Sequence, residues 1–63
     1  MAHNHELFFE NYISKHELAQ RLGISVSLVN KLMTDGLPCL KIGRSVRYRF
    51  SDVTSWLHRR SIQ

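Results

Sequence analysis

Apolar positions at helical spacing mark the first half of the chain. Ser14 precedes the first run and Glu17 stands three residues later, which is the capping-box pattern that begins a helix. Gly23 comes directly after this run and can end the helix in left-handed geometry. Ser25 can cap a second run at once, and Gly36 follows its end. The pattern predicts two helices, over residues 15–22 and 26–34, joined by a short turn.

Alternating apolar and polar positions replace the helical spacing after residue 38. This pattern predicts a β-hairpin over residues 39–50 with a three-residue turn at 43–45. Such a turn places Ile42 opposite Val46 and brings the apolar side chains of both strands onto one face. The expected inner set is Leu40, Ile42, Val46, Tyr48 and Phe50, and the expected outer set is Cys39, Lys41, Arg47 and Arg49.

Helical spacing returns in the last part of the chain, where Val53, Trp56 and Leu57 repeat at three and four residues. Ser51 or Asp52 can cap this run, so we expect a helix over residues 52–60. Residues 12–60 then form one domain that is mainly α with a small β-hairpin, followed by a tail at 61–63. Residues 1–11 show no clear period and stay unassigned as an N-terminal arm.

Size and charge narrow the class of protein. The chain has 63 residues and one cysteine, so it has room for one small domain and no internal disulfide. It has neither a membrane-spanning apolar run nor a signal-peptide pattern, which predicts a cytoplasmic protein without a membrane partner. The net charge is +4, and Lys41, Arg44, Arg47 and Arg49 fall within nine residues that contain no acid. This local basicity favours a polyanionic partner.

Two short helices joined by a glycine-containing turn are typical of a helix-turn-helix. Small Ala19 stands where the second helix would cross closely, and Gly23 permits the change of backbone sign that the turn requires. The apolar positions that complete the pattern are Leu18, Leu22, Ile24, Val29 and Leu32.

The segment after the second helix extends the pattern, and it reads DGLPCLKIGRSVRYRFSDVTSWL. It resembles the excisionase-like branch of the MerR superfamily, in which a helix-turn-helix runs into Gly-Leu-Pro, a basic hairpin and a Trp-Leu helix. The resemblance covers residues 12–60, and AlpA-like phage regulators are similar. It implies a winged helix-turn-helix that binds double-stranded DNA, with a short strand at Tyr12-Ile13 beside the hairpin.

The second helix of a helix-turn-helix enters the major groove. Val29, Leu32 and Met33 occupy its inner face, so the remaining side chains are candidates for DNA contacts. These candidates are Ser25, Ser27, Leu28, Asn30, Lys31 and Thr34. Asn30 suits adenine, whereas Lys31 suits a phosphate or guanine. The alternative is an ordinary solvated helix face.

The basic hairpin is the expected wing, with Arg44 at its tip suited to a minor groove. The wing candidates are Lys41, Arg44, Ser45, Arg47 and Arg49. A solvated strand face that protects an edge from aggregation is the alternative. Four cations without an acid favour DNA contact over edge protection. Further candidates for phosphate contacts are Lys15, Arg21, Arg59 and Arg60.

No pattern in the chain predicts catalysis, a cofactor or a metal. His3 and His5 resemble a fragment of a metal site, but an arm or tag is the more common origin of two such residues. Cys39 has no activating neighbour in the sequence, which favours a structural thiol over a nucleophile. Trp56, with Tyr48 and Phe50, fits a core better than a base-stacking platform. We expect a protein that is not an enzyme.

The resemblance also implies a role. Excisionases, or recombination directionality factors, bind cooperatively, bend DNA and direct integrase-mediated excision, with an integrase or recombinase and further copies of themselves as partners. The chain has no heptads after Trp56-Leu57 for a coiled-coil dimer, so excision is the leading expectation, in the bacterial nucleoid. An AlpA-like transcriptional regulator of a phage or mobile element is the alternative. A third is a protein-interaction module that uses Leu7, Phe8 and Phe9 as an exposed apolar patch and its basic wing for an acidic partner.

Overall fold

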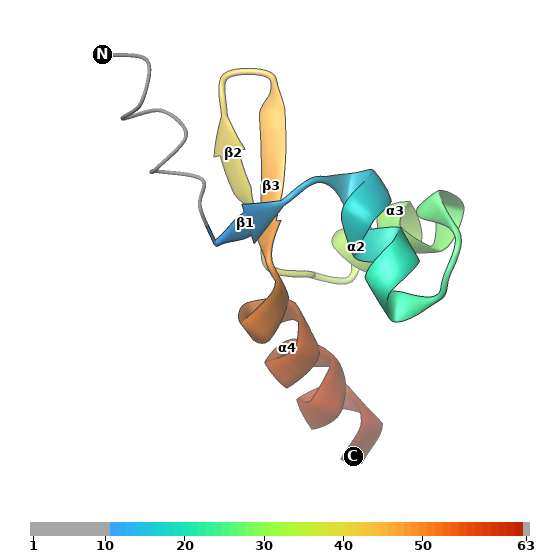
Figure 1. Ribbon diagram of the computed structural model, residues 1–63. Helices are drawn as coiled ribbons and strands as arrows, with labels where there is room; N and C mark the ends of the chain where they lie inside the picture. Colours follow the sequence, from blue (N-terminus) through green and yellow to red (C-terminus); the bar gives the residue numbers. More distant parts are fainter. Residues whose placement is uncertain (1–10, 63) are drawn as a thin grey trace.

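A computed structural model describes residues 11–62 of the chain. The elements run β1 (Tyr12–Ile13), α2 (Lys15–Leu22), α3 (Val26–Thr34), β2 (Leu40–Ile42), β3 (Ser45–Arg49) and α4 (Phe50–Ile62). α2 and α3 lie side by side, the β2–β3 hairpin projects to one side of them, and α4 runs away on the opposite side (Figure 1). The fold is therefore mainly α with a small antiparallel sheet, as predicted, and the first two helices have the predicted bounds.

The helix-turn-helix is defined by the capping residues that the sequence indicated. The Ser14 hydroxyl accepts from the Glu17 amide at 3.2 Å, and the Ser25 hydroxyl accepts from the Leu28 amide at 3.0 Å. Gly23 ends α2 with φ of 70°, and the amide of Ile24 reaches back to the Ala19 carbonyl at 3.0 Å. This pairing is the Schellman arrangement, so the turn closes on its own backbone.

The capping box at the start of α2 is formed only in part. The Ser14 half is present, but the Glu17 carboxylate accepts from Arg21 one turn later, at 2.8 Å. An i,i+4 pair of this kind stabilises an exposed helix slightly, by about 0.2–0.5 kcal/mol. Glu17 therefore stabilises α2 through its pair with Arg21, and not by accepting from the Ser14 amide as a full capping box would.

β3 lies in the middle of the sheet, in the order β1-β3-β2. β1 pairs antiparallel with β3, with Ile13 opposite Tyr48. This is the short strand beside the hairpin that the excisionase-like resemblance implies. The buried side chains are Ile13, Leu18, Ala19, Val29, Leu37, Tyr48 and Val53. The core therefore lies where β1, β3 and the helices meet.

The predicted register of the hairpin is wrong by one residue. Ile42 pairs with Ser45 and Lys41 with Val46, so the turn contains two residues and not three. A type II′ turn has a positive φ at the first of its two central residues only. Gly43 has φ of 58°, and no non-glycine residue in the described part of the chain has a positive φ, so the Gly43-Arg44 turn fits this type. Leu40 and Ile42 consequently lie on the face opposite Tyr48, and Ile42 is 40% exposed. The hairpin projects beyond the core, so burial does not determine which face of β2 is apolar.

The last helix begins earlier than predicted. Phe50, expected in the strand, is its first residue, and α4 starts directly where β3 ends. Val53 is fully buried, whereas Phe50, Trp56 and Leu57 are partly buried against the core. The alternating apolar positions up to Phe50 therefore belong to one apolar face, and this face crosses from β3 into α4.

Candidate nucleic-acid interface

α3 presents a polar surface on the side opposite its buried residue, Val29. Ser27, Lys31 and Thr34 lie near the centre of that surface, since they are separated by three and four residues. Leu28 lies on one flank and is 39% exposed, and Asn30 lies on the other. All the α3 candidates predicted to contact DNA are therefore exposed, including Ser25 at the N-cap.

Three polar groups of this surface already have partners within the protein. The Ser25 hydroxyl caps α3, and the Thr34 hydroxyl donates to the Lys31 carbonyl at 2.6 Å. Asn30 Oδ1 accepts from Lys15 Nζ, also at 2.6 Å. Lys15 was expected only as a phosphate contact, and its bond to Asn30 spans fifteen residues, so no local sequence signal could have indicated it.

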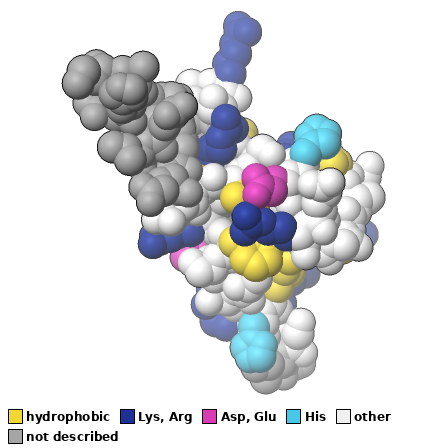
Figure 2. Space-filling model, in the orientation of Figure 1, with side chains coloured by type: hydrophobic (Ala, Val, Ile, Leu, Met, Phe, Trp, Pro, Cys, Tyr) yellow, Lys and Arg dark blue, Asp and Glu magenta, His cyan; other side chains and the backbone are white. Residues whose placement is uncertain are grey.

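The five wing candidates divide between the two faces and the tip of the hairpin. Lys41 pairs with Val46 and so shares the face of Tyr48, which packs toward the helices. Arg47 and Arg49 project from the opposite face, and Ser45 begins β3 beside the tip. The expectation that Lys41 lies on the same face as the two arginines is therefore wrong. Figure 2 shows basic side chains at the projecting end of the hairpin and separate basic groups elsewhere on the face in view.

Arg44 is exposed at the hairpin tip, next to Gly43. In the described part of the chain, the ion pairs within 4.0 Å join Arg21 to Glu17 and Arg60 to Asp35, so none involves Arg44. Arg47 is half-buried and donates to its neighbour's carbonyl, Val46 O, at 3.0 Å. Arg44 therefore lies at the turn of the hairpin, whereas Arg47 and Arg49 lie within β3.

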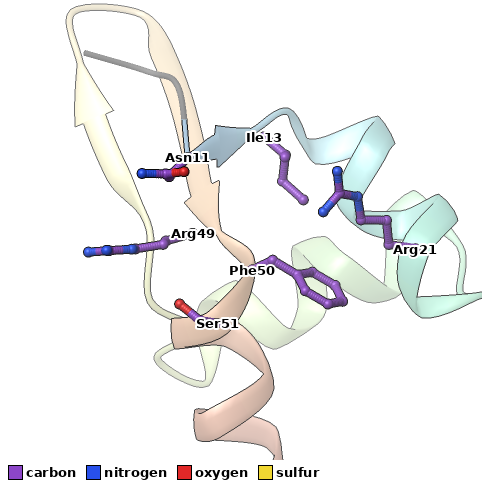
Figure 3. A pocket seen from close by; sticks show the side chains of 6 residues that line it. All are labelled: Asn11, Ile13, Arg21, Arg49, Phe50 and Ser51. Atoms are coloured by element: carbon purple, nitrogen blue, oxygen red, sulfur yellow. The ribbon is translucent and has the colours of Figure 1, made fainter. Parts of the chain in front are cut away.

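Arg49 and Arg21 lie at the base of the hairpin, where they line an open pocket of about 520 Å³ (Figure 3). In Figure 3 the Arg49 side chain points away from the helix pair, whereas the Arg21 guanidinium points from α2 toward Ile13 and Phe50. The Arg21 guanidinium lies 5.4 Å from the centroid of the Phe50 ring. Together with the bond to Glu17, this contact holds Arg21 against the protein.

The two candidate arginines on α4 differ in their surroundings. Arg60 lies over the Trp56 ring at 4.7 Å from its centroid and reaches Asp35 at 3.4 Å. It therefore links the end of α3 to the last turns of α4. Arg59 is exposed on the same helix, which lies on the side of the molecule away from the hairpin.

Tyr48 connects the wing to α3. Its side chain is fully buried, and its hydroxyl donates to Met33 Sδ at 2.8 Å. Burial, and then the charge that nearby Cys39 acquires on ionisation, raise the pKa of Tyr48 above its ordinary value. The phenol therefore remains a neutral donor at physiological pH, and its bond to Met33 links β3 to α3.

Two further observations on residues 11–62 concern metal ligands and membrane-spanning helices. Within that range, no three metal-ligating side chains gather in one place. No helix in the same range has the length and apolarity needed to cross a membrane. The metal and protein-interaction alternatives depend on residues outside the described range, namely His3, His5, Leu7, Phe8 and Phe9. Cys39 is an exposed free thiol.

Comparison with known families identifies the fold. The model of the helix-turn-helix domain family matches residues 12–61, which includes every helix and strand described above except the last residue of α4. The chain belongs to the helix-turn-helix domain family. Comparison with curated proteins and with solved structures found no significant match.

Membership of this family makes DNA the partner of the domain. In a helix-turn-helix domain, the second helix of the motif is the one that enters the major groove, and here that helix is α3. The hairpin then stands as the wing of a winged helix-turn-helix domain. The side chains of α3 and of the wing that contact bases or phosphates stay predictions.

Proposed function

We propose that this helix-turn-helix domain binds double-stranded DNA at specific sequences, as a binding module without catalytic activity. α3 supplies contacts in the major groove and the β2–β3 hairpin supplies contacts to the adjacent minor groove. The observation that carries this proposal is the placement of the hairpin on the same side as the N-terminus of α2, where Lys15 meets Asn30 of α3 (Figure 1). A duplex on that side meets both elements at once.

The charge distribution supports phosphate contacts on both walls of a groove. Lys41 and Arg47 project from opposite faces of the hairpin, and Arg44 extends from its tip. A hairpin inserted along a minor groove would place a cation against each backbone, where a narrow groove has a strong negative potential. Arg49 lies at the base of the hairpin and would therefore lie at the outer edge of the groove.

We propose further that the protein acts as an excisionase, or recombination directionality factor. A single module of this size buries only about 600–1,000 Å² on DNA, so its specificity alone is modest. Among residues 11–62, the exposed large apolar side chains are Leu28 and Ile42, which lie on different elements and form no stripe for a stable dimer. Several copies that gather on adjacent sites would gain affinity through effective concentration and would bend the DNA between them.

An AlpA-like transcriptional regulator is the second candidate, since that group shares the order of a helix-turn-helix, a basic hairpin and a Trp-Leu helix. The two roles differ in how the DNA is occupied. An excisionase covers several adjacent sites and bends the duplex, whereas a simple regulator occupies one operator beside a promoter.

Selection of bound duplexes from a random pool is the first experiment, because the spacing of recovered sites reports copy number and arrangement together. Circular-permutation gels on a recovered site then measure bending, and attachment-site DNA with an integrase measures excision. Tandem sites, a bent duplex and stimulated excision are the results expected of an excisionase. One unbent operator beside a promoter would favour the regulator. Binding that does not depend on salt would favour a protein-interaction module.

A further inference from the structure

Lys15 and Asn30 form a polar pair on the surface of the helix-turn-helix, at the flank of α3 nearest the start of α2. The Nζ of Lys15 donates to the Oδ1 of Asn30 at 2.6 Å, and the pair lies exposed to solvent. An ammonium group carries donors and no acceptor, so the amide oxygen of Asn30 faces Lys15 and its NH₂ group points elsewhere. The bond therefore fixes which end of the Asn30 amide is presented to a ligand.

We infer that the Lys15–Asn30 pair reads guanine in the major groove, in place of the adenine that Asn30 alone would suit. This inference rests on the proposed placement of α3 in that groove. Asparagine reads adenine by accepting from the N6 amino group while it donates to N7. In this protein one of the two lone pairs of the accepting oxygen is bonded to an ammonium, and an adenine amino group that used the other would bring its N–H donors against that positive charge.

Guanine offers the complementary pattern. Its N7 and O6 are both acceptors on the major-groove edge. The pair presents donors only, the NH₂ of Asn30 and the remaining N–H groups of Lys15, so both acceptors of guanine can be satisfied. The positive charge strengthens these bonds because hydrogen bonds from an ionised donor are stronger than neutral ones. Lys15 thus determines specificity both through its own contact and by orienting Asn30.

The test compares the bases that wild type and three variants select from the random duplex pool. Asn30→Ala identifies the position, because the preference of wild type is lost there. Lys15→Met keeps the length of the side chain, removes its donors and releases Asn30 Oδ1. Lys31→Met is the matched control: it removes an exposed lysine of α3 that makes no bond to Asn30 among the described contacts.

We expect wild type to prefer guanine at that position by roughly tenfold over adenine, the size of one paired base contact. Lys15→Met should shift the preference to adenine, whereas Lys31→Met should weaken binding to all duplexes and retain guanine. Replacing this guanine with 7-deazaguanine should remove most of the preference, because the N7 acceptor is lost. Inosine should be accepted, since it keeps N7 and O6 and lacks only a minor-groove amino group.

Selection of adenine by wild type, or a preference that Lys15→Met leaves unchanged, would overturn the guanine inference while DNA binding stands. Recovery of no duplex at all would overturn the proposed function together with this inference. Thermal unfolding of Lys15→Met, measured in parallel, separates a change of specificity from a loss of fold. The Lys15–Asn30 bond is exposed, so the melting temperature should stay close to that of wild type.

Discussion

Replacing Arg44 with alanine should remove one phosphate contact of the wing and leave the fold intact. Arg44 is exposed at the tip of a two-residue turn, and none of the ion pairs in residues 11–62 includes it. Arg49→Ala is the matched comparison, since this arginine is also exposed but lies at the base of the same hairpin, where it lines the pocket in Figure 3. The two variants lose the same charge at different distances from the tip.

The magnitude follows from counterion release. Each phosphate contact adds about 0.9 to the slope of log K against log salt concentration. One contact therefore makes the affinity at 0.1 M salt about eightfold higher than it would be at 1 M salt, which corresponds to about 1.2 kcal/mol. Losing the contact removes this gain. We expect Arg44→Ala to lose this full amount, and Arg49→Ala to lose less than about half of it, because Arg49 lies at the base of the hairpin and so enters the groove less far than the tip.

The assay is fluorescence anisotropy of a labelled duplex recovered by selection, titrated at several salt concentrations from 0.05 to 0.2 M, a range in which these slopes are readily measured. The melting temperatures of both variants serve as the control for folding. If Arg49→Ala reduces the slope as much as Arg44→Ala or more, the hairpin does not enter the groove tip first, and the proposed placement of the wing is wrong.

Three further predictions concern the fold that positions this surface. Val29→Ala should lower the free energy of unfolding by about 2 kcal/mol, because Val29 is fully buried beneath the recognition surface; urea unfolding measures this. Gly23→Ala should cost about 1–2 kcal/mol in the same assay, since φ is 70° there and a Cβ would meet nothing within 4 Å, so the cost is that of the backbone alone. Above about pH 10, stability should fall by at most about 1.4 kcal/mol per pH unit, because the unfolded chain releases the Tyr48 proton before the folded one does. Tyr48→Phe should flatten that decline.

Each of these predictions has a result that would contradict it. Ser27→Ala, an exposed change on the same helix as Val29, should alter stability by less than about 0.5 kcal/mol, and an equal effect of both would mean that α3 is not packed as described. A neutral Gly23→Ala would argue against the left-handed turn. If the decline above pH 10 persists in Tyr48→Phe, another group causes it.

The start of α4 shows where a pattern can be continuous across two kinds of element. Val46, Tyr48 and Phe50 alternate as a strand would, yet Phe50 is the first residue of the helix. Its ring still packs against the core and beneath Arg21, so the apolar position was predicted correctly and the element was not.

The sequence by itself determined the helix-turn-helix. Ser14, Gly23 and Ser25 act within four or five residues of themselves, so the bounds of α2 and α3 follow from local hydrogen bonds that any such sequence would make. Helical spacing likewise placed Val29 and Leu18 in the core, where both are fully buried.

Only the tertiary structure decided how the hairpin is paired and which side chains meet across elements. The wing extends beyond the core, so burial of Ile42 or Leu40 contributes too little to determine the register, and the geometry of the Gly43-Arg44 turn determines it instead. The Lys15–Asn30 bond joins residues on two helices, and its existence depends on how those helices cross. Local chemistry therefore specified the helices that carry the interface, and packing specified the hydrogen-bonding pattern that the interface presents.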